Sequence, residues 1–536
     1  MSDTVSESLF DRTFQNVASA WRDIAGRIGI GSAGDPARDM EALEALMRDC
    51  VEARGGEVSA RQRTAELGRV YLEMSSSGRR DFLVLMAHKF AVDPKAVAEA
   101  MAALDQAQGD GERLAAERKA RRALVPLYLK LLTQFNTLPE GVKFLADLRA
   151  DLLALIKDDP YLAALDDDLH ELLTSWFDVG FLDLRRITWD SSASLLEKLI
   201  LYEAVHEITS WSDLRDRLDS DRRLYALFHP RMPEEPLAFV EVALVMGMSA
   251  SIQTLLDEQA PSGDPENADS AIFYSISNTQ RGLQGIAFGE YLIKMVVQQL
   301  ARDLPRIKSY CTLSPVPGFR GWLKTLPAST LDAVLSGEEQ EAVVQRAADH
   351  GSESADSAEA LQTLLALSDW PAETELTELL EGPVLRLAAG YFQQARADGR
   401  PLDPVARFHL KNGARLERIN WLGDRSPKGL KQSAGIMVNY RYLPDEIEAN
   451  HEAYMSDGKV AAGPEVKSLM KRLKKTKALQ PPTEEAKQPK EPKESKEPAV
   501  AEPTAVTPSD EGTSPPEEQP TAETSATPAE EVKGAA

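Results

Sequence analysis

The chain has 536 residues, 43% of them hydrophobic and 27% charged, which is typical of globular proteins and predicts more than one domain. Its formal net charge of -24 at pH 7 argues against nucleic acid and anionic membranes as partners, because both repel an acidic surface. Two cysteines, no signal-like start and no uncharged apolar run near the ~20 residues of a membrane span predict a cytoplasmic protein without a disulfide framework.

Residues 1–188 predict an all-helical bundle. Ala, Leu, Glu and Arg dominate this region, and apolar residues recur at spacings of three and four, as on one face of a helix. The segments with this pattern are 39–53, 61–75, 79–92, 95–104 and 124–135. Helices of this kind bury their apolar stripes against one another, so we expect a bundle.

Residues 189–475 predict a second domain built on a mixed sheet. Runs rich in aromatic and β-branched residues alternate there with helical segments, which indicates an α/β layer. The expected strands are 223–229, 237–245, 271–277 and 307–314, and the expected helices include 193–208, 250–259 and 289–302. The fold class is therefore α+β and multidomain. Residues 476–536 are rich in Pro, Glu and Lys, and we expect them to form a disordered tail.

A stretch of small residues follows the expected strand 271–277 and opens a helix. It reads Gln-Gly-Ile-Ala-Phe-Gly over 284–289. A helix N-terminus presents free N–H groups and a partial positive charge, and small side chains let a phosphate approach the backbone. The stretch lacks the Gly-Lys-Ser/Thr of a P-loop and the Gly-x-Gly-x-x-Gly of dinucleotide-binding folds.

This stretch resembles the Gln/Arg-x-x-Gly-x-Gly/Ala loop of GNAT-type acyltransferase folds, which wraps the pyrophosphate of coenzyme A. Ala287 stands where glycine is commonest in that loop. The resemblance implies that a pyrophosphate lies against the backbone of Gln284, Gly285, Ile286, Ala287, Phe288, Gly289 and Glu290. The small residues are expected because a branched side chain, as in Gly289→Val, would block the phosphate.

Several longer segments together resemble the malonyl-CoA decarboxylase family. They are 229–244, 271–294, 313–323, 403–424 and 435–454, and the resemblance covers roughly residues 190 to 470. It implies a helical oligomerisation domain (1–188) followed by a GNAT-like catalytic domain (189–475), with malonyl-CoA as substrate and acetyl-CoA and CO2 as products. It also implies a homo-oligomer, a dimer or a tetramer, formed through the N-terminal helices.

Two residues match the catalytic pair of that family. Ser314 precedes Pro315, which disfavours a helical conformation at Ser314, and it follows the expected strand 307–314. His409 lies between Phe408 and Leu410, and it would point away from both if the segment were extended. A histidine near its usual pKa of ~6.5 can deliver a proton at neutral pH. The resemblance implies that His409 protonates an enolate and that Ser314 engages the malonyl carboxylate or the thioester.

Other polar residues are weaker candidates. His206, His88 and His170 fit structural roles, and His229 lies in a segment near the expected site. Possible contacts to the nucleotide of coenzyme A are Arg281, Lys294 and Lys428, and possible supporting residues are Asn412, Asn420 and Tyr440. Cys311 is interpreted as a small strand residue, because the reaction needs no covalent step.

No metal motif such as HExxH or paired CxxC is present, and a thioester is itself an electron sink, so neither a metal nor another cofactor is expected. Two alternatives stay open. One is a GNAT-type acyltransferase, which would need an acceptor groove and a general base. The other is a non-catalytic, helical scaffold that only binds acyl-CoA.

Overall fold

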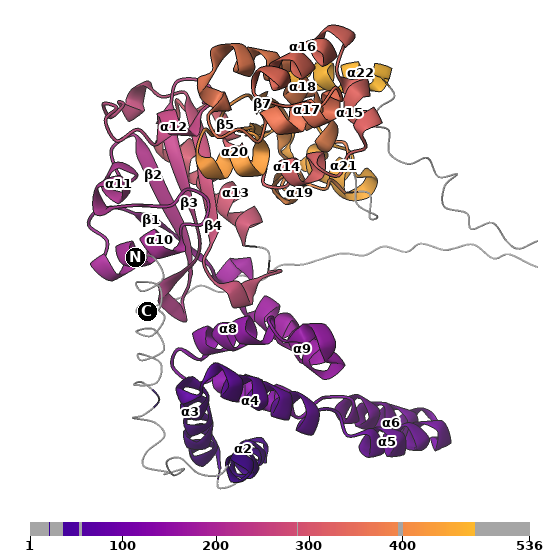
Figure 1. Cartoon of the computed structure of the whole chain (residues 1–536). Helices are drawn as coiled ribbons and strands as arrows, with labels where there is room; N and C mark the ends of the chain where they lie inside the picture. The colour runs from indigo at the N-terminus through magenta and orange to yellow at the C-terminus, as the bar shows by residue number, and fades with distance from the viewer. Residues whose placement is uncertain (1–20, 22–35, 53–55, 287, 395–399, 477–536) are drawn as a thin grey trace, which may run out of the picture. The chain divides into compact units, whose positions relative to one another are not determined.

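The described N-terminal part of the chain is helical as predicted up to Trp176, but Asp183–Ile187 form a strand, so the predicted all-helical region 1–188 extends too far. The computed structural model describes residue 21 and residues 36–52, 56–286, 288–394 and 400–476 (Figure 1). Its first helices are α2 (Pro36–Val51), α3 (Glu57–Glu73), α4 (Ser76–Lys89), α5 (Pro94–Gln106), α6 (Asp110–Ala123), α7 (Tyr128–Asn136), α8 (Gly141–Leu152) and α9 (Pro160–Trp176). The predicted tail lies outside the described residues from residue 477 onward.

Asp-Pro pairs fix where two of these helices begin. The side chain of Asp93 accepts a hydrogen bond from Lys95 N, and the side chain of Asp159 accepts one from Tyr161 N. The proline that follows each aspartate occupies the first helical position, where no N–H is required. The breaks in the sequence pattern are therefore helix starts.

The second part of the chain is built on a mixed eight-stranded sheet. The strands are β1 (Asp183–Ile187), β2 (Arg222–His229), β3 (Met232–Val245), β4 (Ser270–Asn278), β5 (Ser309–Thr312), β6 (Ser314–Pro315), β7 (Arg415–Asn420) and β8 (Met437–Tyr442). Their order is β1-β2-β3-β4-β5-β8-β6, and β7 also pairs with β8. Strands β4 and β5 pair in parallel, and every other pair of these strands is antiparallel. The predicted fold class, a helical region followed by a domain built on a mixed sheet, is confirmed.

Helices cover both faces of the first strands. On one face, α10 (Ala193–Tyr202) and α11 (Trp211–Asp216) bury Leu199 and Leu214 against strands β1 to β3. On the other face, α13 (Gly289–Asp303) packs on β1, β2 and β3. The core beneath α13 continues into the N-terminal helices, since the Phe177 and Phe288 rings lie 5.7 Å apart.

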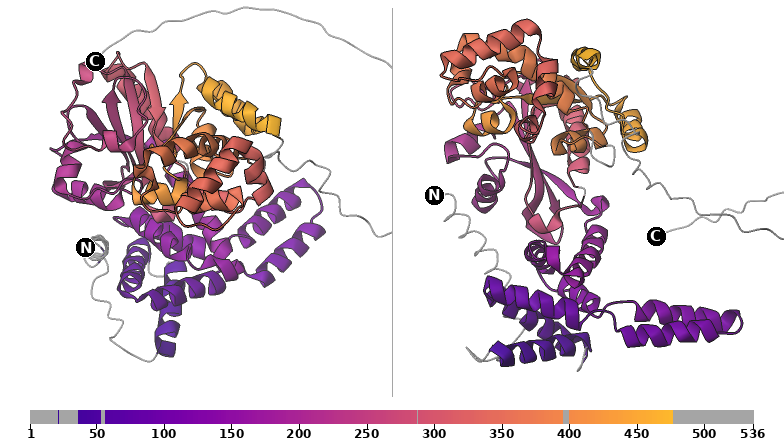
Figure 2. Two further views of the ribbon diagram at one scale, coloured as in Figure 1. Left: turned by 45° about the horizontal axis from the view of Figure 1, so that its top comes forward. Right: turned by 45° about the vertical axis from the view of Figure 1, so that its right-hand side comes forward.

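The remaining helices gather beside the far strands of the sheet (Figures 1 and 2). They are α12 (Ile252–Leu255), α14 (Phe319–Leu323), α15 (Ala328–Val334), α16 (Gly337–Asp349), α17 (Ser357–Leu364), α18 (Thr374–Tyr391), α19 (Pro404–Lys411), α20 (Pro427–Ser433), α21 (Ile447–Asp457) and α22 (Pro464–Thr476). Within the described residues, no helix is both long enough and apolar enough to cross a membrane.

The sheet opens between β4 and β5. The parallel pairing runs from Ser270 with Ser309 to Phe273 with Thr312, and Leu313 N then donates to Phe273 O. Beyond that point β4 continues to Asn278 while pairing with β3. The backbone of β4 after Phe273 therefore has an open edge that faces β6.

The prediction of one helix over 193–208 is wrong in its second half. Helix α10 ends at Tyr202, and residues 203–209 are irregular. The carboxylate of Glu203 accepts hydrogen bonds from Val205 N and His206 N, and it also accepts from Ser275 Oγ on β4. These contacts to the backbone and to the sheet compete with the helical hydrogen bonds, so a helical pattern of apolar residues does not continue as a helix. The predicted helix 250–259 is likewise reduced to the single turn α12.

Candidate active site

Ser314 and His409 meet, although 95 residues separate them in the sequence. Ser314 Oγ lies 3.1 Å from His409 Nε2, and the two residues are only 6% and 2% exposed. Ser314 opens the short strand β6, where it pairs with Val438 of β8. His409 lies in α19, not in an extended segment, so its direction is set by the helix and not by alternation with its neighbours.

Helix α19 is anchored at its start, which fixes His409 one turn and a half later. Asp403 is the N-cap and accepts a hydrogen bond of 2.7 Å from Ala406 N, while Pro404 occupies the first turn. Burial raises the pKa of Asp403 to about 6. His409 is thus presented by a short, capped helix with Ala406 and Leu410 on its buried side.

Both ring nitrogens of His409 have partners. Nδ1 lies 2.8 Å from the hydroxyl of Tyr442 on β8, and the ring stacks on Tyr440 with centroids 4.5 Å apart. Ser314 Oγ donates to Thr312 Oγ1 at 2.8 Å, and Thr312 Oγ1 also accepts from Tyr440 N at 3.1 Å. Because the serine proton goes to Thr312, the network is satisfied by a neutral imidazole that donates from Nε2 to Ser314 and accepts from Tyr442 at Nδ1.

The expectation of an ordinary histidine pKa is wrong for His409 in this structure. Burial lowers the pKa of His409 to about 3, because a charged imidazolium is poorly solvated there. The ring is therefore neutral at pH 7 until another charge enters the cavity.

Ser314 and His409 line a cavity of about 280 Å³ on the open edge of β4. Phe273, Tyr274, Ile276 and Asn278 of β4 form one wall. The other wall is formed by β6 and α19, through Ser314, Pro315, Pro404, Val405, Phe408 and His409. The cavity is thus mostly apolar, with a hydroxyl and an imidazole facing an unpaired strand edge.

A second cavity, of about 270 Å³, is lined by the loop that precedes α13. Gln284, Gly285, Ile286 and Phe288 line it together with Arg281, and Asn278 borders both this cavity and the one at Ser314. Ala287 lies outside the described residues, and Glu290 is the second residue of α13. The structure therefore brings most of the predicted pyrophosphate loop next to the Ser314–His409 cavity.

The structure gives the glycines of this loop a further reason besides the predicted approach of a phosphate. A side chain on Gly289 would place its Cβ 2.6 Å from the Phe408 ring, and Gly285 has φ +92°, which L-residues rarely adopt. Gly289 is therefore small because Phe408, the neighbour of His409, packs against it. Gly289→Val would disturb His409 as well as the loop.

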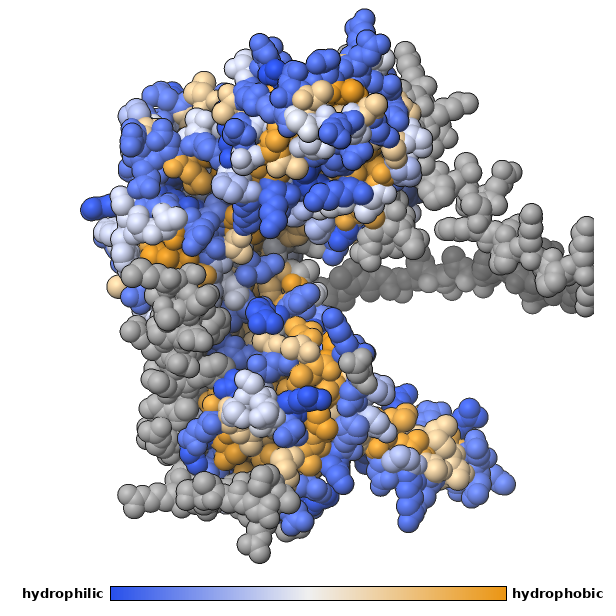
Figure 3. Space-filling model, viewed as in Figure 1, coloured by the Kyte–Doolittle hydropathy of each residue, from blue (hydrophilic) through white to orange (hydrophobic). Residues whose placement is uncertain are grey.

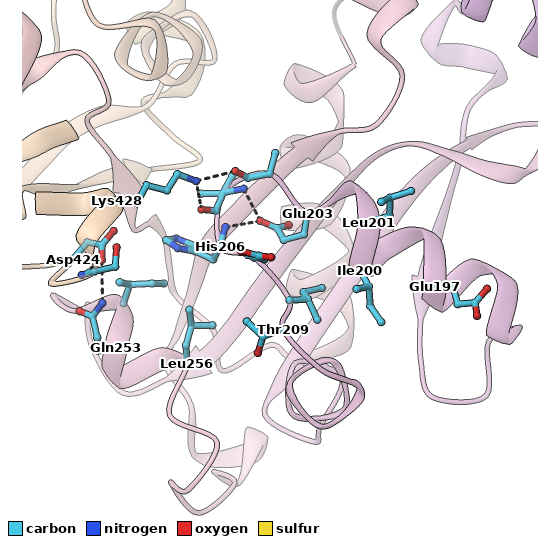
Figure 4. Close-up of a pocket in the computed structure, with 16 residues that line it drawn as sticks. Glu197, Ile200, Leu201, Glu203, His206, Thr209, Gln253, Leu256, Asp424 and Lys428 are labelled. Carbon is cyan, nitrogen blue, oxygen red and sulfur yellow. Dashed lines mark hydrogen bonds between the residues drawn. The ribbon is translucent and has the colours of Figure 1, made fainter. Parts of the chain in front are cut away.

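A third and larger cavity, of about 760 Å³, adjoins the first at Val205 (Figure 4). The irregular segment 203–207 separates the two. Lys428 holds this segment by donating to Ala204 O at 3.0 Å and Val205 O at 2.8 Å. His206 faces the larger cavity, and burial lowers its pKa to about 4.

The weaker candidates divide between the site and its surroundings. Tyr440 stacks on His409, and Asn420 donates to Asn439 Oδ1, whose amide in turn donates to Thr312 O. Arg281 lines the loop cavity, and Lys428 holds segment 203–207 as described above.

Of the other weak candidates, only Asn412 contacts the pair, because its backbone N–H donates to His409 O at 3.1 Å. His229 interacts with Trp176 O, Lys294 is exposed on α13, and Asn412 is buried at the end of α19. Burial raises the pKa of Cys311, so this thiol is not activated. Among the described residues, no three His, Cys, Asp or Glu side chains group as a metal site.

Sequence analysis missed Tyr442, Thr312 and Asn439. A signal was present for two of them, because residues two apart on a strand share a face. Tyr442 is two residues from Tyr440, and Thr312 is two residues from Ser314. Asn439 points to the opposite face of β8 from Tyr440, and its role depends on contacts to Thr312 and β7 that no local pattern reveals.

Comparison with known proteins gives consistent matches along the chain. Residues 90–177 match the malonyl-CoA decarboxylase N-terminal domain, and residues 180–480 match the malonyl-CoA decarboxylase C-terminal domain. The mitochondrial malonyl-CoA decarboxylase of Anser anser anser is 38% identical over 78% of this chain and 85% of its own. That of Rattus norvegicus is 36% identical over 80% of this chain and 85% of its own.

Two crystal structures are similar throughout their length. The malonyl-CoA decarboxylase of Rhodopseudomonas palustris is 42% identical with a TM-score of 0.71, covering 80% of this chain and 99% of that one. The enzyme of the same name from Agrobacterium vitis is 40% identical with a TM-score of 0.70, at the same coverage.

Proposed function

The chain belongs to the malonyl-CoA decarboxylase family, and from this we propose that it converts malonyl-CoA to acetyl-CoA and CO2 in the cavity between β4 and β6. The observation that carries the proposal is the meeting of Ser314 and His409, 3.1 Å apart and buried, at the open edge of β4. A proton donor is thereby held in an apolar cavity, where a developing negative charge interacts strongly with the few polar groups present.

The reaction breaks the bond between C2 and the carboxylate carbon. The bonding electron pair moves onto C2 and the thioester oxygen as CO2 leaves, which gives an enolate, and C2 then takes one proton. We assign that proton to His409 Nε2, because this nitrogen faces Ser314 and the cavity. Tyr442 holds the ring through Nδ1 and leaves Nε2 as the donor.

The low pKa of His409 fits this sequence once the substrate is considered. A malonyl carboxylate that enters the buried cavity raises the pKa of a neighbouring histidine, because an imidazolium is stabilised by a nearby anion. The negative charge stays in the cavity as the enolate after CO2 leaves. The imidazolium, which takes its extra proton from solvent as the carboxylate binds, then gives a proton to C2, and acetyl-CoA and a neutral imidazole remain.

Ser314 orients the acyl group. Its hydroxyl bonds Thr312 and the imidazole in the ligand-free protein, so it can exchange a partner for a substrate oxygen without moving far. Either a carboxylate oxygen or the thioester oxygen suits this role.

The coenzyme A part of the substrate would lie along the two smaller cavities. The pantetheine arm would lie along the open edge of β4, where amide groups of a strand hydrogen-bond to an extended chain. The pyrophosphate would lie at Gln284 to Glu290, next to Arg281. Asn278, which borders both cavities, would stand at the junction.

The simplest test uses purified protein and malonyl-CoA with no amine present. Release of CO2 with formation of acetyl-CoA is expected. Consumption of malonyl-CoA only when an acyl acceptor is added would overturn the proposal and favour acyl transfer. Tight binding of malonyl-CoA without turnover would favour the non-catalytic scaffold.

Acyl transfer is the second candidate because of the large cavity beyond Val205. It adjoins the Ser314–His409 cavity, and His206 and Glu203 stand in its wall, so an acceptor and a base have space there (Figure 4). Glu203, however, already accepts from two backbone amides and two serines of β4. This carboxylate is therefore engaged in holding the backbone, and decarboxylation remains the better candidate.

No cofactor enters the proposed reaction, because the thioester accepts the electron pair. Dialysis against a chelator should leave turnover unchanged, and a loss of activity that a divalent ion restores would contradict this.

We also propose a homo-oligomer formed through the N-terminal helices. A cytoplasmic location is proposed because Cys50 and Cys311 are both free and buried, as in a reducing compartment.

A further inference from the structure

The back of segment 282–285, which leads into the loop 284–290, is formed by the N-terminal helices. Arg149 of α8 is 4% exposed, and its Nη1 donates to Gly282 O and to Gln284 O, both at 2.8 Å. Arg149 Nε donates to Asp166 Oδ1 of α9 at 2.8 Å, which fixes the plane of the guanidinium. One side chain from the N-terminal helices thus holds one carbonyl of the loop, Gln284 O, and one carbonyl just before it, Gly282 O.

The loop lies directly on these helices. A Cβ on Gly282 would come within 1.6 Å of Ala146 O in α8, so no side chain fits between them. At Gly285 a Cβ would come within 3.1 Å of His170 Nε2 in α9. The close approach on two sides shows that α8 and α9 form the rear support of the loop.

The two hydrogen bonds determine which way the loop amides point. In a trans peptide the N–H points away from the preceding C=O. Because Gln284 O is held by Arg149, the N–H of Gly285 points away from α8, and both residues line the loop cavity on their exposed side. The guanidinium of Arg149 forms an ion pair with Asp166, which offsets its positive charge. Its main contribution is therefore to orient the peptide groups of the loop.

We propose that Arg149 is a positioning residue for the pyrophosphate of coenzyme A. The N-terminal helical region then contributes to substrate binding as well as to assembly. This inference rests on the proposed role of residues 284–290. It predicts that loss of Arg149 weakens binding of the nucleotide half of the substrate while the chemistry at His409 is unaffected.

The test compares Arg149→Met with Lys143→Met. Lys143 is a matched control, because it lies on the same helix, is 2% exposed and pairs with Asp147 at 2.5 Å within α8. Dissociation constants for coenzyme A and for pantetheine are measured by calorimetry, and KM and kcat for malonyl-CoA and malonyl-pantetheine by product analysis. Pantetheine lacks the pyrophosphate, so it reports on the rest of the site.

Arg149→Met should raise the dissociation constant of coenzyme A and the KM of malonyl-CoA about 10–100-fold, as expected when a binding group is displaced by about 1 Å. The constants for pantetheine and malonyl-pantetheine, and kcat, should stay within about 2-fold of wild type, which is a change under about 0.5 kcal/mol. Lys143→Met should lower the melting temperature without separating the two ligands. A folded Arg149→Met that loses affinity for both ligands, or for neither, would overturn the proposal.

Arg149→Lys serves if the methionine variant does not fold. A lysine keeps the charge beside Asp166 but is a single ammonium centre without the planar fork of arginine, so it cannot hold both carbonyls in the same way. It should show a smaller selective loss for coenzyme A. If wild type itself bound coenzyme A no better than pantetheine, the loop would not bind pyrophosphate, and the role of Arg149 would fall with it. If wild type and both variants preferred coenzyme A over pantetheine by the same factor, the positioning role of Arg149 would be overturned, whereas pyrophosphate binding by the loop would stand.

Discussion

The Ser314–His409 cavity and the loop 284–290 adjoin at Asn278 but are constructed in different ways. The first is buried and is held within the sheet domain by Thr312, Tyr440 and Tyr442. The second is exposed on its ligand side and is held from behind by α8. Reaction and anchoring are therefore supported by different parts of the chain. Substitutions should separate kcat from substrate affinity, and the predictions below test that separation.

The largest effect is expected at Ser314 and His409. His409→Asn should lower kcat by about 10²–10⁴-fold, the usual contribution of a positioned proton donor, and Ser314→Ala should lower it heavily as well, because the acyl group is no longer oriented toward His409. The dissociation constant of coenzyme A should change little, because the loop is supported elsewhere. Steady-state kinetics and calorimetry on folded variants measure both quantities.

His350→Asn is a suitable control, because His350 is partly exposed and pairs with Glu373 on the helical surface. It should turn over at a rate close to wild type. Near-normal kcat in folded Ser314→Ala or His409→Asn would remove that residue from the mechanism.

A smaller effect on the same region is expected from Tyr442→Phe. The ring keeps its packing, but His409 Nδ1 loses its 2.8 Å partner, so the tautomer with hydrogen on Nε2 is no longer favoured. We expect kcat to fall about 10-fold, in line with the loss of one hydrogen bond of about 1.4 kcal/mol, with KM unchanged. If KM changed and kcat did not, Tyr442 would act on binding and not on the imidazole.

The sequence predicts more of the Ser314–His409 cavity than of the loop 284–290 and its support. Ser314 and His409 are identified by segments that resemble a family, and strand alternation links Thr312 and Tyr442 to them. The loop 284–290 is identified by its small residues, but the packing of Phe408 in the space beside Gly289 is not visible in the sequence. Its support by Arg149 could not be predicted, because a buried arginine in a helical pattern looks like any solvated cation.

The irregular segment 203–207 shows the same limit. Its residues continue the apolar helical pattern of α10, so the sequence predicts helix up to Ile208. The helix ends at Tyr202 because Glu203 bonds serines of β4, and Lys428 and Arg217 bond the carbonyls that follow. Side chains more than 10 residues away thus override local propensity, and no window of sequence contains them.

Acid should destabilise the first region through His409. The pKa of His409 is lowered to about 3 in the folded chain, against ~6.5 when unfolded. Between these values the unfolded state binds the extra proton, so stability rises with pH and is lost as pH falls below about 6.5. From pH 7.5 to 5.5 this histidine should account for about 1.4 kcal/mol of lost stability.

Denaturant unfolding at both pH values checks this. His409→Asn, which cannot titrate, should lose less stability on acidification than Ser314→Ala, which keeps the buried histidine. Equal acid sensitivity in the two variants would mean that His409 is not held neutral by burial.

The smallest effect on either region is expected from the hairpin of α5 and α6, which packs mainly on itself. It exposes Met101 and Leu114, which are 43% and 56% accessible, and apolar side chains are visible on its surface in Figure 3. Two short helices bury little apolar area alone, and in a two-fold dimer the same patch of each copy meets its equivalent, so this surface is a candidate for the proposed homo-oligomer. Light scattering should give a dimer or tetramer for wild type and a lower mass for Met101→Glu/Leu114→Glu. The variant should keep kcat and the affinity for coenzyme A, because neither helix touches Ser314, His409 or Arg149 in the contacts described above.

A monomeric wild type at micromolar concentration would contradict the oligomer, whereas an oligomer that survives the double substitution would place its interface on other helices.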